Sequence, residues 1–229
     1  AETLAVFQSD PRYPRFKDIA ERIFQDKERI PYGSLHNGYV YNFWRDEEHV
    51  RGVWRRALLD DYLKSDIPWE VLLDVDALAQ EERENWVYRG SAALEPDCRR
   101  WLVELSRGGK DAVEVREFDV RKKSFVAGGF VLREAKSRAA WLDRDRLLVA
   151  TDFGAGSLTA SGYPRILKLW RRGEPLDKAP TVFEGERRDM DVEFLRDFAS
   201  EEAYGLVVRR RTFYETEYRL LDKSFRLVA

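Results

Sequence analysis

The segment Arg146-Leu147-Leu148-Val149-Ala150 is short and apolar, and after a polar loop the chain continues as Arg165-Ile166-Leu167-Lys168-Leu169-Trp170. The same order of two segments recurs at 39–45 with 53–60, at 100–105 with 113–119, and at 204–208 with 217–222. Third segments follow at 69–73, 124–126, 181–183 and 225–228, and opening segments stand at 86–94, 138–142 and 190–195. Units of about 40–50 residues with four strands each are typical of β-propeller blades.

The composition of these segments fits sheets that stack around an axis. Inner strands are covered on both faces and are therefore continuously apolar, as at 147–150, whereas outer strands carry charges such as Arg171 and Arg172, which discourage edge-to-edge pairing. The sequence predicts an all-β fold, a partial propeller of the seven-bladed type with about four blades of four-stranded antiparallel sheets. The predicted propeller spans 35–229, with blades at 35–76, 86–132, 138–186 and 190–229. A β-sandwich with irregular strands is the alternative.

The first 34 residues are predicted to contain one amphipathic helix. Asp10 and Pro11 can begin it, and Pro31 ends it. Apolar residues at helical spacing define one face, namely Phe16, Ile19, Ala20, Ile23 and Phe24. Because such a face must be covered, the segment 1–34 is expected to pack against another domain.

Composition excludes several classes of function. The 229 residues include 40 Lys and Arg against 42 Asp and Glu, a formal charge of −2, which argues against a dedicated nucleic-acid binder. No apolar run is long enough for a membrane-spanning helix and no leader peptide opens the sequence, so we expect no membrane partner and no signal peptide. Cys98 is the only cysteine, which indicates a reducing, cytoplasmic setting. The sequence contains only two histidines, His36 and His49, in addition to this cysteine, so we expect no metal site and no cofactor. We expect both histidines in solvated loops.

Several segments together resemble the prolyl oligopeptidase family, in particular its bacterial branch. They are Asp10-Pro11-Arg12-Tyr13-Pro14, Arg29-Ile30-Pro31-Tyr32, Tyr41-Asn42-Phe43-Trp44-Arg45, Trp69-Glu70-Val71-Leu72-Leu73-Asp74, and the stretches 105–112, 151–159 and 161–165. The likeness covers nearly the whole chain. It implies a seven-bladed propeller inserted into an α/β-hydrolase domain that carries the catalytic serine, aspartate and histidine.

The resemblance therefore implies that this chain is the N-terminal helix and first blades of a serine peptidase, a hydrolase that cleaves short peptides, often at proline. The propeller would gate and select short substrates for a hydrolase domain of the same polypeptide. No Gly-x-Ser-x-Gly elbow occurs here, so the chain alone is expected to be inactive and to hold no catalytic residue. Other possibilities are a complete four-bladed propeller, a stand-alone propeller that acts as a binding scaffold, and an enzyme complete in itself.

The loop from Asp152 to Tyr163 is the most unusual stretch, because it is rich in glycine, serine and threonine. The family resemblance favours a loop that faces the cleft toward the hydrolase domain and governs substrate entry, and a flexible hairpin loop is the alternative. The residues assigned to substrate gating are Asp152, Phe153, Ser157, Thr159, Ser161, Tyr163 and Arg165. Arg209-Arg210-Arg211 is interpreted as a solvated strand end or as a contact with an acidic surface of the hydrolase domain.

Overall fold

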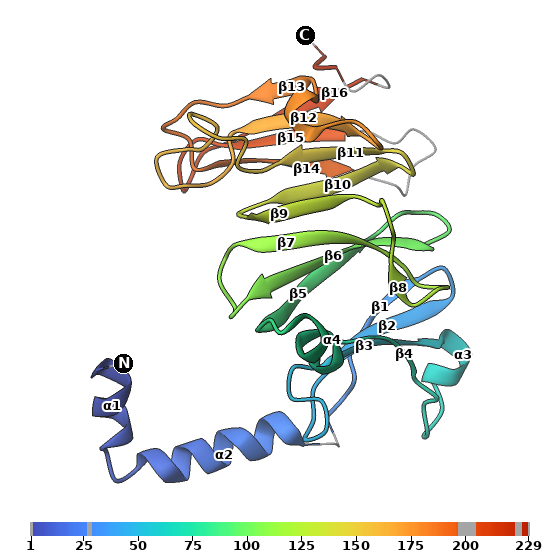
Figure 1. Cartoon of the computed structure of the whole chain (residues 1–229), viewed down its shortest axis with the longest axis vertical. Coiled ribbons are helices and arrows are strands. Elements are labelled where there is room, and N and C mark those ends of the chain that lie inside the picture. Colours follow the sequence, from blue (N-terminus) through green and yellow to red (C-terminus); the bar gives the residue numbers. More distant parts are fainter. Residues whose placement is uncertain (1, 27–28, 197–204, 223–225, 229) are drawn as a thin grey trace. The chain divides into compact units, whose positions relative to one another are not determined.

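A computed structural model describes residues 2–26, 29–196, 205–222 and 226–228 (Figure 1). The chain forms two compact units, residues 1–82 and 83–229. Within the described residues the strands form four antiparallel sheets, and each sheet is built from strands that follow one another in the sequence. No helix in these ranges is long and apolar enough to span a bilayer.

The first unit contains one sheet of order β1-β2-β3-β4 and four helical segments. Their bounds are α1 Glu2–Gln8, α2 Tyr13–Gln25, β1 Ser34–His36, β2 Tyr39–Trp44, β3 Val53–Leu58, α3 Leu59–Tyr62, β4 Glu70–Asp74 and α4 Val75–Glu82. Trp54 on β3 is almost fully buried. The adjacent Arg55 guanidinium stacks between the rings of Trp44 (4.6 Å) and Trp69 (4.3 Å), and burial lowers its pKa to about 10.

The helix expected from the apolar spacing is α2, with a proline in its first turn. It ends at Gln25, well before Pro31, because Asp26 has ψ 122° and leaves the helical region. Helix α1 was not expected. The apolar face of α2 remains open to solvent: Phe16 is 64% exposed and Phe24 is 70% exposed. The sequence predicts that this face packs against another domain, and in the structure it is uncovered.

The second unit contains three consecutive sheets. The first is β5 Trp86–Ala93, β6 Arg100–Arg107, β7 Val113–Asp119 and β8 Ser124–Phe125, with β9 Val131–Ala135 also paired to β7. The next is β10 Arg138–Asp143, β11 Arg146–Ala150, β12 Ile166–Arg171 and β13 Thr181–Glu184, with the 3-10 turn η1 Leu176–Lys178 between the last two strands. The third is β14 Asp191–Arg196, β15 Gly205–Arg210 and β16 Thr216–Leu221.

Strand β11 shows why its sequence is apolar throughout. Leu147 and Val149 join a core cluster with residues of β6, β7 and β9, whereas Leu148 and Ala150 join a second cluster with residues of β14, β15 and β16. The middle sheet is thus covered on both faces. Three sheets stacked in this way are propeller blades and exclude the two-layer sandwich considered above.

The outer edges of two blades differ from the regular pattern. In the first blade of the second unit, β8 has two residues and β9 pairs with the same strand, β7, so the outer edge is shared by two short strands. In the last sheet the expected closing segment 225–228 lies partly outside the described residues, and an isolated bridge joins Leu221 to Leu227.

Antiparallel pairing places alternate connections of the second unit at one end of its sheets. We call this end the loop face, and it comprises residues 108–112, 136–137, 151–165, 185–190 and 211–215. Contacts between these connections confirm that they lie at the same end of the sheets. Lys136 Nζ lies 3.9 Å from Asp111 Oδ2 and 3.9 Å from the centre of the Tyr163 ring. The Ala160 N–H donates to Arg187 O at 2.7 Å.

Candidate functional site

The loop between β11 and β12 has a defined internal structure. Leu158 and Pro164 form an antiparallel bridge, flanked by hydrogen bonds from the Thr159 N–H to Tyr163 O (2.8 Å) and from the Arg165 N–H to Ser157 O (3.2 Å). The loop is therefore a small hairpin closed by its own backbone hydrogen bonds.

Ser157 lies inside this hairpin. Its side chain is buried, and its hydroxyl accepts from the Phe153 N–H at 2.9 Å. The same hydroxyl lies 2.7 Å from Gly154 O and 3.1 Å from Asp152 Oδ1, and Asp152 Oδ1 also accepts from the Gly154 N–H. Ser157 and Asp152 Oδ1 thus satisfy polar groups of the turn.

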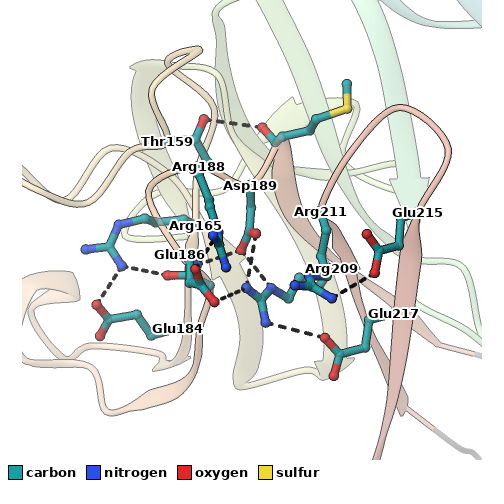
Figure 2. A network of polar contacts seen from close by, with 12 residues as sticks. Thr159, Arg165, Glu184, Glu186, Arg188, Asp189, Arg209, Arg211, Glu215 and Glu217 are labelled. Carbon is teal, nitrogen blue, oxygen red and sulfur yellow. Dashed lines mark hydrogen bonds and ion pairs between the residues drawn. The ribbon is translucent and has the colours of Figure 1, made fainter.

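Thr159 and Ser161 connect the hairpin to the segment before β14. Their hydroxyls lie 3.0 Å apart, and the Thr159 hydroxyl donates to Met190 O at 3.3 Å (Figure 2). Thr159 is buried and Ser161 is exposed. Thr159 therefore fixes the hairpin against the next connection of the loop face.

Arg165 holds the hairpin from its base. Its Nε donates to Gly156 O at 2.8 Å. Its Nη1 donates to Gly185 O at 2.8 Å and to Glu184 Oε1 at 2.6 Å (Figure 2). One guanidinium therefore joins the loop to the end of β13.

The aromatic members of the predicted set point to different surroundings. Phe153 packs against the core cluster around β11, and Lys168 Nζ lies 4.7 Å from its ring centre. Tyr163 is half-buried, and its hydroxyl lies 3.5 Å from Asp111 Oδ2. The structure thus gathers the seven predicted residues in one hairpin, but turns Phe153, Ser157 and Thr159 inward.

Replacing Ser157 with alanine should destabilise the second unit, because the Phe153 N–H would lose its acceptor. We expect the free energy of unfolding to fall by about 1–3 kcal/mol. The matched control is Ser161→Ala, an exposed hydroxyl of the same hairpin, for which a loss below about 0.5 kcal/mol is expected. Denaturant unfolding measures both changes, and equal losses in the two variants would contradict the role assigned to Ser157.

An ion-pair network lies next to the hairpin on the loop face (Figure 2). The buried carboxylate of Asp189 accepts from Arg209 Nε at 2.7 Å and from the Glu186 N–H at 2.6 Å, while Arg209 Nη2 also lies 2.9 Å from Glu186 Oε1. Burial by itself raises the pKa of Asp189, but these hydrogen bonds outweigh it and hold the pKa below its usual value.

The arginines at 209–211 are thus engaged in ion pairs with carboxylates of their own sheet and of the connections beside it. Arg210 pairs with Asp191 at 2.9 Å and with Glu193, and Arg211 pairs with Glu215 at 2.7 Å. The interpretation of this run as a solvated strand end is wrong for Arg209, whose side chain is 12% exposed. Sequence reasoning missed the pairing because Asp189 lies in the connection before β14, and its contact with Arg209 of β15 depends on the fold.

A depression opens beside the hairpin, with a volume of about 460 Å³. The residues that line it are Asp152, Gly154, Ala155, Gly156, Leu158, Thr159 and Arg187. Arg187 was not predicted from the sequence. It is exposed, and its side chain has no hydrogen bond or ion pair among the described residues.

The histidines and the cysteine lie outside the hairpin. His49 Nδ1 lies 3.0 Å from Asp46 Oδ1, and His36 lies in β1, which corrects its expected place in a loop. Cys98 is buried, and burial raises the pKa of its thiol to about 12, so it stays protonated near neutral pH.

Antiparallel sheets that follow one another in sequence and stack face to face define a β-propeller, and the comparisons place it in a family. Residues 4–223 match the model of the prolyl oligopeptidase N-terminal β-propeller domain. This chain belongs to the prolyl oligopeptidase family, and the matched region is that propeller domain.

The relatives are peptidases. A Sinorhizobium fredii protein described as an uncharacterised peptidase is 38% identical over 218 residues, which cover 94% of this chain and 30% of the relative. A Rickettsia prowazekii protein of the same description is 34% identical over 240 residues, which cover 99% of this chain and 33% of the relative. The chain spans about a third of the length of these relatives.

Solved structures agree with the fold. A post-proline cleaving enzyme from Rickettsia typhi superposes with a TM-score of 0.87 at 34% identity, over 99% of this chain and 34% of that enzyme. Oligopeptidase B from Leishmania major reaches a TM-score of 0.68 at 14% identity, over 92% of this chain and 29% of that chain.

Proposed function

We propose that this chain is the substrate-gating propeller portion of a serine oligopeptidase that cleaves short, proline-containing peptides. The catalytic serine, aspartate and histidine belong to an α/β-hydrolase domain of the same polypeptide, and the chain itself contributes selection rather than chemistry. The supporting observation is the likeness, at 34% identity over nearly the whole chain, to a post-proline cleaving enzyme. The cytoplasmic setting expected from the single cysteine remains part of this proposal.

The gating role is assigned to the hairpin 152–165. In the second unit, the connections from one blade to the next lie on the loop face, together with this hairpin. Where a propeller is inserted into another domain, the chain enters and leaves the propeller at the end of the sheets where the blade-to-blade connections lie. We therefore expect the hydrolase domain above the loop face, with Asp152, Ser161 and Tyr163 toward the cleft and Arg165 holding the hairpin at its base.

The N-terminal segment is assigned a different contact. The apolar face of α2 is exposed in the described structure, and covering Phe16, Ile23 and Phe24 would remove a large apolar area from water. We propose that the segment 1–34 packs on the hydrolase domain and that the propeller begins after it, at residue 35.

The gating role is tested in the whole peptidase by Arg165→Ala, which removes the hydrogen bonds to Gly156 O and Gly185 O. A looser hairpin should admit larger substrates. We expect the ratio of kcat/KM for a long peptide to that for a pentapeptide to rise about fivefold, equivalent to about 1 kcal/mol of barrier. Arg171→Ala, at the other end of β12, is the matched control and should leave the ratio unchanged.

Hydrogen exchange across 152–165 shows whether Arg165→Ala has loosened the hairpin. A loosened hairpin with an unchanged ratio would refute gating by this loop. The chain alone provides the blank: it should neither hydrolyse proline-containing chromogenic peptides nor react with serine-directed phosphonates, because it lacks a nucleophile elbow.

A further inference from the structure

The depression beside the hairpin is built on a fixed frame. The Ser157 hydroxyl accepts a hydrogen bond from the Phe153 N–H, and Arg165 Nε donates a hydrogen bond to Gly156 O. Gly154 and Gly156 adopt φ of +103° and +83°, and a Cβ at either position would meet nothing within 4 Å, so the rim is open. These contacts keep the shape of the depression without help from a ligand.

Arg187 brings to this frame a positive charge that has no ion-pair partner among the described residues. The nearby carboxylates already have other partners: Asp189 pairs with Arg209 at 2.7 Å, Glu184 pairs with Arg165 at 2.6 Å, and Glu186 pairs with Arg188 at 2.7 Å. The Arg187 N–H groups and the backbone N–H groups of Ala155 and Gly156 have no acceptor among the described residues.

The acid at the depression is also committed. Asp152 Oδ1 accepts from the Gly154 N–H at 2.8 Å and lies 3.1 Å from the Ser157 hydroxyl. Asp152 thus shapes the turn, and no ion pair joins it to Arg187 within the described ranges. The unpaired guanidinium of Arg187 has planar donors that fit a carboxylate in bidentate fashion.

We propose that this depression is a subsite for a carboxylate of the peptide substrate, held by Arg187. This inference rests on the proposed function and adds a preference for peptides with a free C-terminus or an acidic side chain. Both sources present the same group, and both would reach Arg187 from the loop face.

The test measures peptide binding to the full chain by isothermal titration. The probes are an acetylated alanyl-prolyl tetrapeptide with a free C-terminal carboxylate, the same peptide as its amide, and the amide with one internal aspartyl residue. We expect the free acid to bind about fivefold more tightly than the amide, as for a partly exposed ion pair. The aspartyl amide tells whether a side-chain carboxylate serves equally well.

Arg187→Gln should remove the difference between acid and amide. Arg121→Gln is the control, since Arg121 is exposed on the turn between β7 and β8, at the other end of the sheets. Added salt should weaken binding of the acid alone. Equal binding of acid and amide, no binding of either, or discrimination that persists in Arg187→Gln would overturn the proposal.

The outcome is separable from that of the gating experiment. If Arg165→Ala changes size selection while acid and amide bind alike, gating stands and the carboxylate subsite falls. If acid and amide differ as expected while size selection is unchanged, the subsite stands and gating by the hairpin falls.

Discussion

Arg172→Ala is expected to lower the free energy of unfolding of the second unit by about 3 kcal/mol, because it leaves a buried carboxylate without its main partner. Glu117 on β7 has a side chain only 1% exposed, and Arg172 Nη1 reaches it at 2.7 Å from the turn after β12. Arg100 lies farther away, at 3.7 Å. The ion pair therefore joins two adjacent blades.

For a chain of this length, the same loss corresponds to a fall in Tm of about 6–12 °C. Arg171→Ala is the matched control, since Arg171 is exposed and should cost less than about 0.5 kcal/mol. Glu117→Gln and the double variant complete a cycle, and the two single losses should not add. Additive losses, or a loss in Arg171→Ala as large as in Arg172→Ala, would show that the pair does not join the blades energetically.

Asp189→Asn should cost about 2 kcal/mol at neutral pH, because the charge-assisted hydrogen bonds from Arg209 are lost. The variant should also flatten the acid dependence of stability. The pKa of Asp189 is lowered in the folded protein, so its contribution is complete above the unfolded value of about 3.9 and is lost as pH falls through the folded pKa.

Urea unfolding of the wild type and of Asp189→Asn from neutral pH to pH 3 measures this difference. Asp177→Asn, an exposed carboxylate of η1, is the control and should follow the wild type. The expected result is a gap between Asp189→Asn and the wild type that narrows toward the acid end. A constant gap at every pH would mean that the charge of Asp189 is not what stabilises the fold.

The sequence was a good guide wherever burial alone decides structure. The run 147–150 predicted a strand covered on both faces, and its side chains do alternate between two core clusters. Strand β9 was missed because it shares the edge of β7 with β8, an arrangement that periodicity does not express. Helix α1 was missed because it has no buried residue to impose a pattern.

At the candidate site, the unusual composition located the loop but could not assign its side chains. Ser157 looked available for substrate, yet it satisfies a backbone N–H inside the turn. The Asp152-Phe153-Gly154 sequence, which favours a turn closed by the aspartate side chain, could have signalled this. Arg187 could not be singled out, since its lack of a partner depends on how its acidic neighbours pair in three dimensions.

The hydrogen bonds from Thr159 to Met190 O and from Arg165 to Gly185 O make the hairpin inseparable from the following connection. Grafted by itself onto a different propeller, the sequence 151–165 would keep its internal hydrogen bonds but lose the acceptors Met190 O and Gly185 O, which fix its position. The portable module is the hairpin together with 185–190, so substitutions in either stretch are constrained by the other.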